Sequence, residues 1–203
     1  MARYFQDPGL VVALIAPSAV GKSWTALQLA AEGVVATAPS YTTRPPRPGE
    51  TDTDYDHVFV DEPTFDAYSQ AGGFAVQAEL YGNRYGLPPL DPLEDIGPLD
   101  PLARLVLLKD TVVEDFRDVY PGARVYHIES EDSEARMEEI MLARGQDPAD
   151  IEERRSEYQR ELERGRALAD QVFVSPGHPR HNLASIKAAI GRDRQAYDGL
   201  SGF

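Results

Sequence analysis

The stretch that decides the fold is Leu10-Val-Val-Ala-Leu-Ile15, followed by Ala16-Pro-Ser-Ala-Val-Gly21-Lys22-Ser23. The first part is a continuous aliphatic and β-branched run, which is typical of a strand buried on both faces of a parallel sheet. The small residues after it predict a loop, and residues 24–32 predict a helix that Gly33 closes. A buried strand, a glycine-containing loop and a helix in this order are the context that a phosphate-binding loop requires.

The loop is expected to bind phosphate mainly through its backbone, because consecutive N–H groups at a helix N-terminus point toward an anion. Lys22 would reach the β- and γ-phosphates of a nucleotide, and the hydroxyl of Ser23 would ligate Mg²⁺. Ala16 stands at the first position of the motif instead of glycine, which strains the loop only if that residue needs a positive φ. The indole of Trp24 is expected to pack in the core. The predicted ATP-binding residues are Ala16, Pro17, Ser18, Ala19, Val20, Gly21, Lys22, Ser23 and Trp24.

Composition excludes several classes of protein. The 203 residues include 34 Asp and Glu against 20 Lys and Arg, which gives a net charge of -14, and there is no Cys. Disulfide scaffolds and Cys-based zinc sites are therefore excluded, and an acidic chain is a poor partner for nucleic acid. The longest apolar run has seven residues, whereas a membrane span needs about 20. We expect a soluble cytoplasmic protein that binds neither nucleic acid nor membrane.

Apolar strand candidates alternate with amphipathic helices along most of the chain, which predicts an α/β fold with a mostly parallel sheet. Proline- and glycine-rich segments at residues 39–49, 81–86 and 88–101 are expected to be irregular. The further predicted strands are residues 34–38, 55–60, 74–79, 102–108, 123–128 and 172–174. The further predicted helices are residues 63–70, 111–118, 133–143, 150–169 and 182–197.

Three motifs follow the loop: Ser40-Tyr-Thr-Thr-Arg44-Pro-Pro-Arg47-Pro-Gly-Glu50, then Asp54-Tyr55, then Gly82-Asn-Arg-Tyr85-Gly86. Their order and spacing resemble the guanylate kinase family, in which a phosphate loop precedes T-T-R-x-P-R-x-G-E, D-Y and G-N-x-Y-G. The resemblance covers about residues 10–175. It implies a P-loop NTPase-type parallel sheet flanked by helices, with an inserted monophosphate-binding segment and a short lid.

On this resemblance the chain is one domain. The expected core comprises about residues 1–38, 100–143 and 160–203. The expected insert is about residues 39–95 and the expected lid about residues 144–158. The oligomeric state is not readable from the sequence.

The resemblance also implies site residues, and their chemistry agrees, because Arg forks and Tyr hydroxyls suit a dianionic phosphate. The family's phosphate-clamp positions correspond to Arg44, Arg47, Tyr55 and Tyr85, and the positions near the acceptor base or behind the clamp correspond to Ser40, Glu50 and Asp110. The lid arginines, which close over the transferring phosphoryl group, correspond to Arg144 and Arg154. The expected catalytic set is Lys22, Arg44, Arg144 and Arg154.

Plainer interpretations stay open for several of these residues. The loop could be an ordinary strand-to-helix turn, and residues 44–48 could be an exposed polyproline-type ligand. Tyr85 could simply pack on a turn, and Arg144 and Arg154 could belong to a solvated helix face. The four histidines show no ligand spacing and are expected to be surface or packing residues.

The chain departs from the family pattern where the acceptor base would be read. The family usually has Glu at position 76, where this chain has Val76, and Glu79 should face away because strand alternation puts residues three apart on opposite faces. Leu108 stands where an acidic residue is usual, Ile140 where a lid Arg is usual, and Ser175 where an Asn is usual.

The predicted function is ATP- and Mg²⁺-dependent phosphoryl transfer to a nucleoside monophosphate, with GMP or dGMP giving GDP or dGDP. One alternative is a kinase of the same family that acts on another base or on a sugar phosphate. The other is a guanylate-kinase-like binding module without catalysis. The expected partners are ATP and a nucleoside monophosphate.

Overall fold

Five parallel strands form the central sheet of the computed structural model, in the order β2-β7-β1-β8-β9. The structure describes residues 7–18, 20–47, 50, 56–92, 101–143 and 145–201, apart from a few helical side chains that include that of Arg154. The strands are β1 (Val11–Ile15), β2 (Val35–Thr37), β7 (Ala103–Leu107), β8 (Arg124–Ser130) and β9 (Gln171–Ser175).

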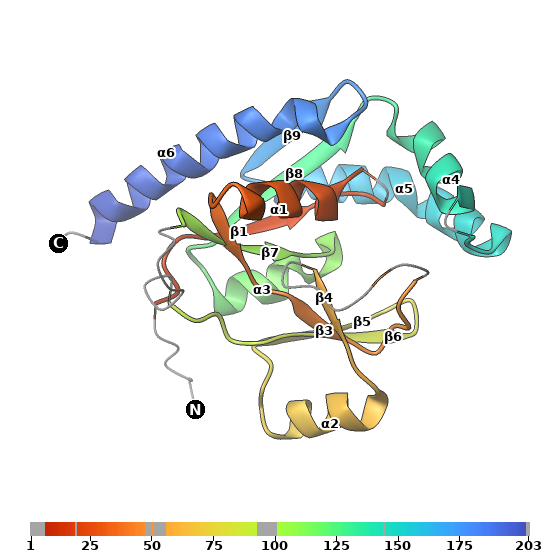
Figure 1. Ribbon diagram of the computed structural model, residues 1–203, viewed down its shortest axis with the longest axis horizontal. Helices are drawn as coiled ribbons and strands as arrows, with labels where there is room; N and C mark the ends of the chain where they lie inside the picture. Colours follow the sequence, from red (N-terminus) through yellow and green to blue (C-terminus); the bar gives the residue numbers. More distant parts are fainter. Residues whose placement is uncertain are drawn as a thin grey trace.

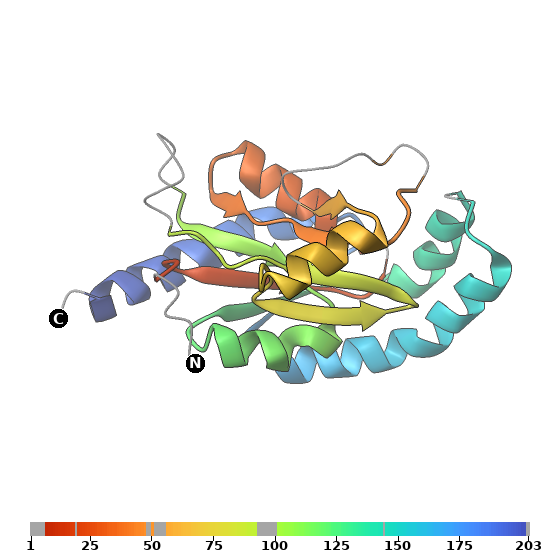
Figure 2. The same ribbon diagram turned by 90° about the horizontal axis from the view of Figure 1, so that it is seen from below.

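Helices cover both faces of this sheet (Figure 1). In Figure 2, α4 and α5 form the end of the molecule opposite the C-terminal end of α6. The helices are α1 (Lys22–Ala31), α2 (Glu62–Gln70), α3 (Val113–Val119), α4 (Ser133–Ala143), α5 (Pro148–Leu168) and α6 (Leu183–Ser201). Two short 3₁₀ turns, η2 (Asp110–Val112) and η3 (Pro179–Asn182), precede α3 and α6.

Strand β1 is buried along its whole length, as its sequence predicts. Val12 and Leu14 pack in one hydrophobic cluster with residues of α1 and α6. Val11, Ala13 and Ile15 pack in a second cluster with residues of α3 and of the smaller sheet. The predicted α/β fold with a parallel sheet flanked by helices is therefore confirmed, because both faces of the strand are covered.

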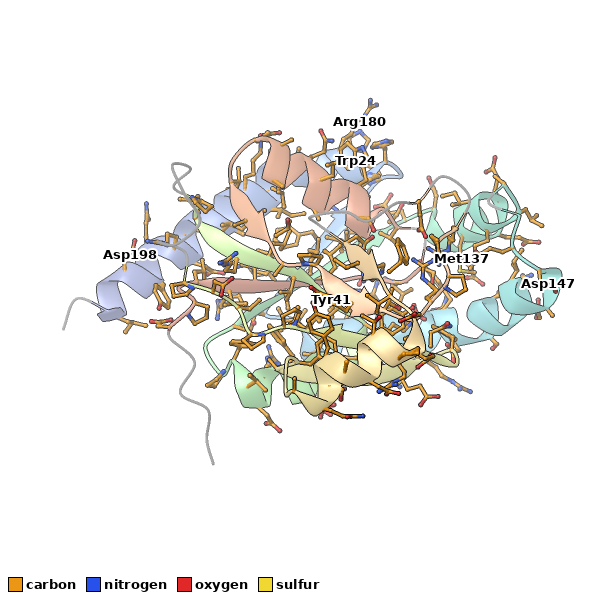
Figure 3. All side chains as sticks on the ribbon, turned by 60° about the horizontal axis from the view of Figure 1, so that its bottom comes forward. Trp24, Tyr41, Met137, Asp147, Arg180 and Asp198 are labelled. Atoms are coloured by element: carbon orange, nitrogen blue, oxygen red, sulfur yellow. The ribbon has the colours of Figure 1, made fainter. Side chains whose placement is uncertain are left out.

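The smaller sheet has the order β4-β3-β6-β5 and is built from residues of the expected insert. Strands β3 and β4 run parallel, whereas β6 is antiparallel to both β3 and β5. Helix α2 packs against it through aromatic contacts, and the ring of Tyr41, labelled in Figure 3, lies 4.9 Å from that of Tyr68. The strands are β3 (Ser40–Thr42), β4 (His57–Phe59), β5 (Val76–Leu80) and β6 (Asn83–Leu87).

Two of these strands correct the sequence prediction. Strand β3 lies in the proline-rich segment that was expected to be irregular, and β6 lies in the segment that was expected to be turns. Strand β6 forms because it pairs with β5, and Gly86 suits this place because a Cβ there would lie 2.7 Å from the ring of Phe74. Cross-strand packing thus overrides the low strand propensity of Asn and Gly.

The ends of several elements also differ from the predictions. Helix α1 begins at Lys22, two residues before the predicted start, and α6 continues to Ser201. Helix α5 is continuous through residue 158, so the expected boundary between lid and core falls inside one helix. Within the described part of the chain, no helix has the length and apolar character needed to span a bilayer.

Candidate active site

A cavity of about 300 Å³ lies where the carboxyl ends of β1 and β7 meet the smaller sheet. One wall is the phosphate loop with Gly21, Lys22 and Ser23. The facing wall comes from β5 and β6 of the smaller sheet. Met141 and Gln146, which flank the turn between α4 and α5, also line it. Three segments that are far apart in sequence therefore meet at one cavity.

Gly21 sets the shape of the phosphate loop. It is the N-cap of α1 with a φ of 98°, and a Cβ at this position would lie 2.6 Å from Cγ of Pro179. Only glycine suits both conditions. Among the described non-glycine residues a positive φ occurs only at Tyr81, so Ala16 replaces the usual glycine without backbone strain.

Lys22 and Ser23 begin α1 and both line the cavity. The N–H groups in the first turn of a helix have no intrahelical partner. The Lys22 Nζ donates a hydrogen bond of 2.8 Å to the carbonyl oxygen of Leu108 at the end of β7. Burial lowers the pKa of Lys22, and the carboxylate of Asp56 opposes that effect. The Ser23 Oγ donates to Oδ2 of Asp56 at 2.6 Å. The turn thus presents a cation, a hydroxyl and backbone donors, which is what a polyphosphate needs.

Arg44, Arg47 and Glu50 form one ion cluster next to β3. The Arg44 Nη1 donates to Oε2 of Glu50 at 2.8 Å, and the Arg47 Nη1 donates to Oε1 at 3.2 Å. Burial alone would raise the pKa of Glu50, but hydrogen bonds from Arg44 and from the backbone N–H of Arg47 lower it to about 2. Arg47 lines the cavity, whereas Arg44 lies behind it with its guanidinium 5.1 Å from the ring centre of Phe59. Glu50 therefore holds both guanidinium groups in place.

Ser40, His57 and Tyr85 also line the cavity, on β3, β4 and β6. The Ser40 Oγ lies 2.9 Å from Nδ1 of His57, and the ring of His57 lies 5.7 Å from that of Tyr85. Nε2 of His57 lies 3.1 Å from Oδ1 of Asp56. Burial lowers the pKa of His57, and Asp56 opposes that effect.

Asp56 is not among the residues predicted from the sequence, and His57 was expected to be a surface or packing residue. Their only sequence signal is adjacency to the Asp54-Tyr55 pair, because their contacts are made with residues that are distant in the sequence. The other histidines fit that expectation better. His127 is buried beside Glu129, with Nε2 3.1 Å from Oε1, and His178 caps η3.

The β5 wall is mostly apolar where it borders the cavity. Val76, Ala78 and Leu80 line it together with Gln77, whose amide oxygen accepts from Oγ of Ser69 at 2.9 Å. Val76 is 6% exposed within the cluster that also contains Leu87. Glu79 lines a second cavity instead, so the prediction that it faces away from Val76 is confirmed. No carboxylate from the described part of β5 faces the first cavity.

Comparison with known proteins identifies the family. No protein-family model matches the chain. A protein named guanylate kinase from Oleidesulfovibrio alaskensis is 38% identical over 160 residues, which cover 76% of this chain and 74% of that protein. The chain belongs to the guanylate kinase family. A guanylate kinase from Thermus thermophilus is 55% identical over 49 residues, which are 24% of this chain and 22% of that protein.

The fold agrees with guanylate kinase as well. A crystal structure of guanylate kinase from Anaplasma phagocytophilum superposes with a TM-score of 0.67 and 23% identity, covering 92% of this chain and 86% of that chain. As a member of the guanylate kinase family, this chain differs from the usual pattern at four positions. Leu108 and Val76 line the cavity, Ile140 is half-buried on α4, and Ser175 is buried and donates to the carbonyl oxygen of Glu129.

Not every residue expected from the guanylate kinase pattern lies at the cavity. Asp110 lies in the second cavity, of about 320 Å³, where Arg164 donates to it at 3.1 Å. In the same cavity Lys109 pairs with Glu161, and the Tyr81 hydroxyl donates to Glu157 at 2.9 Å. The predicted residues Ala19, Tyr55 and Arg144 lie outside the described residues, as does the side chain of Arg154.

Trp24 corrects a prediction, because it is not a core residue. Its side chain is half-buried at the rim of the cavity, and its ring meets that of His178 edge-on at 5.0 Å. In Figure 3, the side chains of Trp24 and Arg180 lie at the upper edge of the molecule, far from those of Asp147 and Asp198. Its place in the predicted ATP-binding set stays a prediction.

Proposed function

We propose that this protein transfers the γ-phosphoryl group of ATP to GMP, giving ADP and GDP, with dGMP as a second acceptor. One observation carries the proposal: the phosphate loop and the arginine cluster meet at a single cavity, which both Lys22 and Arg47 line. A donor polyphosphate and an acceptor monophosphate can therefore meet there. Membership of the guanylate kinase family supports the same reaction.

The chemistry requires two anionic groups to approach each other. An oxygen of the acceptor phosphate bonds to the γ-phosphorus as the bond from that phosphorus to the β,γ-bridging oxygen breaks, and ADP leaves. Such transfers depend mainly on positioning and on neutralising charge. Lys22 and the N–H groups of the loop stabilise charge on the donor, while Arg44, Arg47 and Tyr85 hold the acceptor phosphate. Glu50 keeps the two guanidinium groups aligned before the acceptor binds.

The donor arrives with Mg²⁺, which neutralises charge on its phosphates when bound. This ion prefers oxygen ligands and retains several waters. The hydroxyl of Ser23 is an oxygen donor on the first turn of α1 and lines the cavity. The residues present therefore fit the ion, and Ser23 is the residue that would hold it.

The remaining roles follow from the same proposal. Residues 39–95 act as the monophosphate-binding insert, with Tyr55 completing the clamp and Ser40 supporting the acceptor. Asp110, which belongs to the core, supports the clamp from the second cavity. Residues 144–158 act as the lid, from which Arg144 and Arg154 reach the transferring group. Phosphate-loop residues Ala16, Pro17, Ser18, Ala19, Val20 and Trp24 surround the donor. The reaction takes place in the cytoplasm and involves neither nucleic acid nor a membrane.

A coupled assay with ATP and Mg²⁺ tests the proposal. The acceptors are GMP, dGMP, AMP, CMP, UMP and a sugar phosphate, each measured as kcat/KM. We expect turnover with GMP to exceed that with the others. Turnover with another acceptor in preference to GMP would support the second candidate, which the apolar β5 wall at Val76 favours. Nucleotide binding without turnover on any acceptor would instead indicate a binding module.

A further inference from the structure

A hydrogen bond joins the phosphate loop to the smaller sheet. The Ser23 Oγ donates to Oδ2 of Asp56 at 2.6 Å, although the two residues are 33 positions apart. The backbone of Asp56 is also held, because its carbonyl oxygen accepts from the N–H of Ser40 at 3.0 Å. The carboxylate therefore belongs to the acceptor side of the cavity but acts on a residue of the donor side.

The direction of this bond matters for the hydroxyl of Ser23. A serine hydroxyl has one hydrogen and two lone pairs. When Asp56 accepts the hydrogen, the lone pairs of Oγ remain for a cation. Side chains that ligate metals are commonly oriented by a hydrogen bond to a carboxylate that does not itself touch the metal. Loss of such a carboxylate typically lowers metal affinity 10- to 100-fold.

The carboxylate of Asp56 is itself fixed in place. Its Oδ1 lies 3.1 Å from Nε2 of His57, whose Nδ1 lies 2.9 Å from Oγ of Ser40. Both carboxylate oxygens are thus occupied, one by Ser23 and one by His57. A carboxylate that is held at two points has already lost its rotational freedom, so it can orient a hydroxyl without a further entropy cost.

The neighbouring strand offers no acid for this task. Leu108 stands at the end of β7 where the family usually has an acidic residue, and its carbonyl oxygen accepts from Lys22 instead. Asp56 is also the carboxylate with the largest electrostatic effect on Lys22. It therefore adds negative charge where the cation of a nucleotide complex would arrive.

We propose that Asp56 is a positioning residue for Mg²⁺: it orients the hydroxyl of Ser23 so that the oxygen lone pairs face the cation bound to the nucleotide. This inference rests on the proposed function and goes beyond it by assigning the role to a residue that immediately precedes a strand of the smaller sheet. Asp56 adjoins β4, a strand of the segment that is proposed to hold the acceptor. The orientation of the Ser23 hydroxyl, and with it Mg²⁺ binding at the donor site, therefore depends on where that segment lies.

Calorimetric titration of ADP with Mg²⁺, and again with EDTA, tests the proposal without turnover. The ratio of the two affinities measures what the metal contributes. We expect Asp56→Asn to lower this ratio at least tenfold and to leave the ADP affinity in EDTA within about twofold of that of the unsubstituted protein. Asp56→Glu should restore part of the lost ratio. Asp61→Asn is the matched control, because Asp61 caps α2 and Asn caps a helix equally well.

A double-mutant cycle separates this role from a merely structural one. If Asp56 acts through Ser23, then Ser23→Ala lowers the ratio, and adding Asp56→Asn to it changes little more. Additive losses, an unchanged ratio in Asp56→Asn, or equal losses with Mg²⁺ and EDTA would each overturn the inference. Failure of the proposed function is a separate result: the unsubstituted protein would then bind no Mg·ADP or phosphorylate no GMP.

Discussion

The two walls of the cavity differ in chemistry. The phosphate-loop wall presents Lys22, Ser23 and the first turn of α1, and Arg47 of the arginine cluster also lines the cavity. The β5 wall presents Val76, Ala78 and Leu80 together with Gln77, whose amide oxygen is bonded to Ser69. The parts that we propose to hold phosphate are thus polar, whereas the β5 wall, where the family usually has a glutamate that binds the acceptor base, is mostly apolar.

This difference separates the reaction from its selectivity. Phosphoryl transfer needs charge neutralisation, and the charged groups for it are present. Base discrimination needs a polar group aimed at the base, and a hydrophobic wall discriminates less well than a hydrogen-bonding one. Substitutions on the first wall should therefore change rate, and those on the second should change the choice of acceptor.

The largest effect is expected for Lys22→Ala. Removing one charged donor that acts on the transferring group costs about 10³-fold in kcat. Coupled-assay kinetics measure this, and thermal unfolding checks that the variant is folded. Lys187→Ala is the control, because Lys187 pairs with Glu32 on the surface. Equal rates for Lys22→Ala and Lys187→Ala would contradict the assigned role.

Val76→Glu should change acceptor choice instead of rate. A charged hydrogen bond to the base is worth about 1.5–3 kcal/mol, so selectivity for GMP over AMP should rise about 10- to 150-fold. Stability should fall at the same time, because the carboxylate enters an apolar cluster. Val76→Gln has the same length without the charge and should show a smaller gain. If selectivity for GMP rises in neither variant, the assignment of Val76 to the acceptor site is wrong.

Gly21→Ala tests the rigidity of the phosphate-loop wall. The positive φ and the contact with Pro179 should together lower the free energy of unfolding by about 2 kcal/mol. Gly191→Ala is matched, because Gly191 lies inside α6 with open space around it, and there Ala should raise stability by about 0.5–1 kcal/mol. Urea unfolding measures both. Similar behaviour of the two variants would refute the strain argument.

The smallest effect concerns Glu50 and pH. Its pKa is lowered to about 2 in the folded protein from an ordinary value of 4.5. Its ionised form therefore contributes stability above pH 4.5, and this contribution is lost as pH falls toward 2. Glu50→Gln should be less stable at pH 6 and should lose less stability between pH 4.5 and 3. Urea unfolding at these pH values would show parallel losses if the arginine cluster contributed nothing.

Much of the fold was predictable because short segments of the sequence determine it. The apolar run before residue 16 predicted β1 to within one residue, and most helices carry clear amphipathic patterns. Strands β3 and β6 were missed because their residues favour turns and become strands only by pairing with partners elsewhere in the chain. The early start of α1 was missed because Gly21, with its positive φ, caps the helix without a side-chain hydrogen bond.

The site residues also fall into those that short segments predicted and those that depend on long-range contacts. Lys22 and Ser23 were predicted from a loop of eight consecutive residues, and Arg47 and Tyr85 from their motifs. Asp56 and His57 were not, because their significance lies in contacts with residues that are distant in the sequence: Asp56 with Ser23, and His57 with Ser40 on the paired strand β3. Trp24 was expected in the core, but the neighbouring His178 comes from a turn more than 150 residues later in the chain.

The amino-acid sequence alone determined that this chain has a phosphate loop on a parallel sheet and a set of arginines suited to a second phosphate. These features depend on backbone geometry and side-chain chemistry within short segments, so they can be recognised without coordinates. Only the tertiary structure decided which groups meet: the Ser23 hydroxyl and Asp56, the Lys22 ammonium and the carbonyl oxygen of Leu108, and the mostly apolar β5 wall that lines the same cavity. Such contacts join segments that are distant in the chain, so strand pairing within each sheet and packing between the two sheets set their distances.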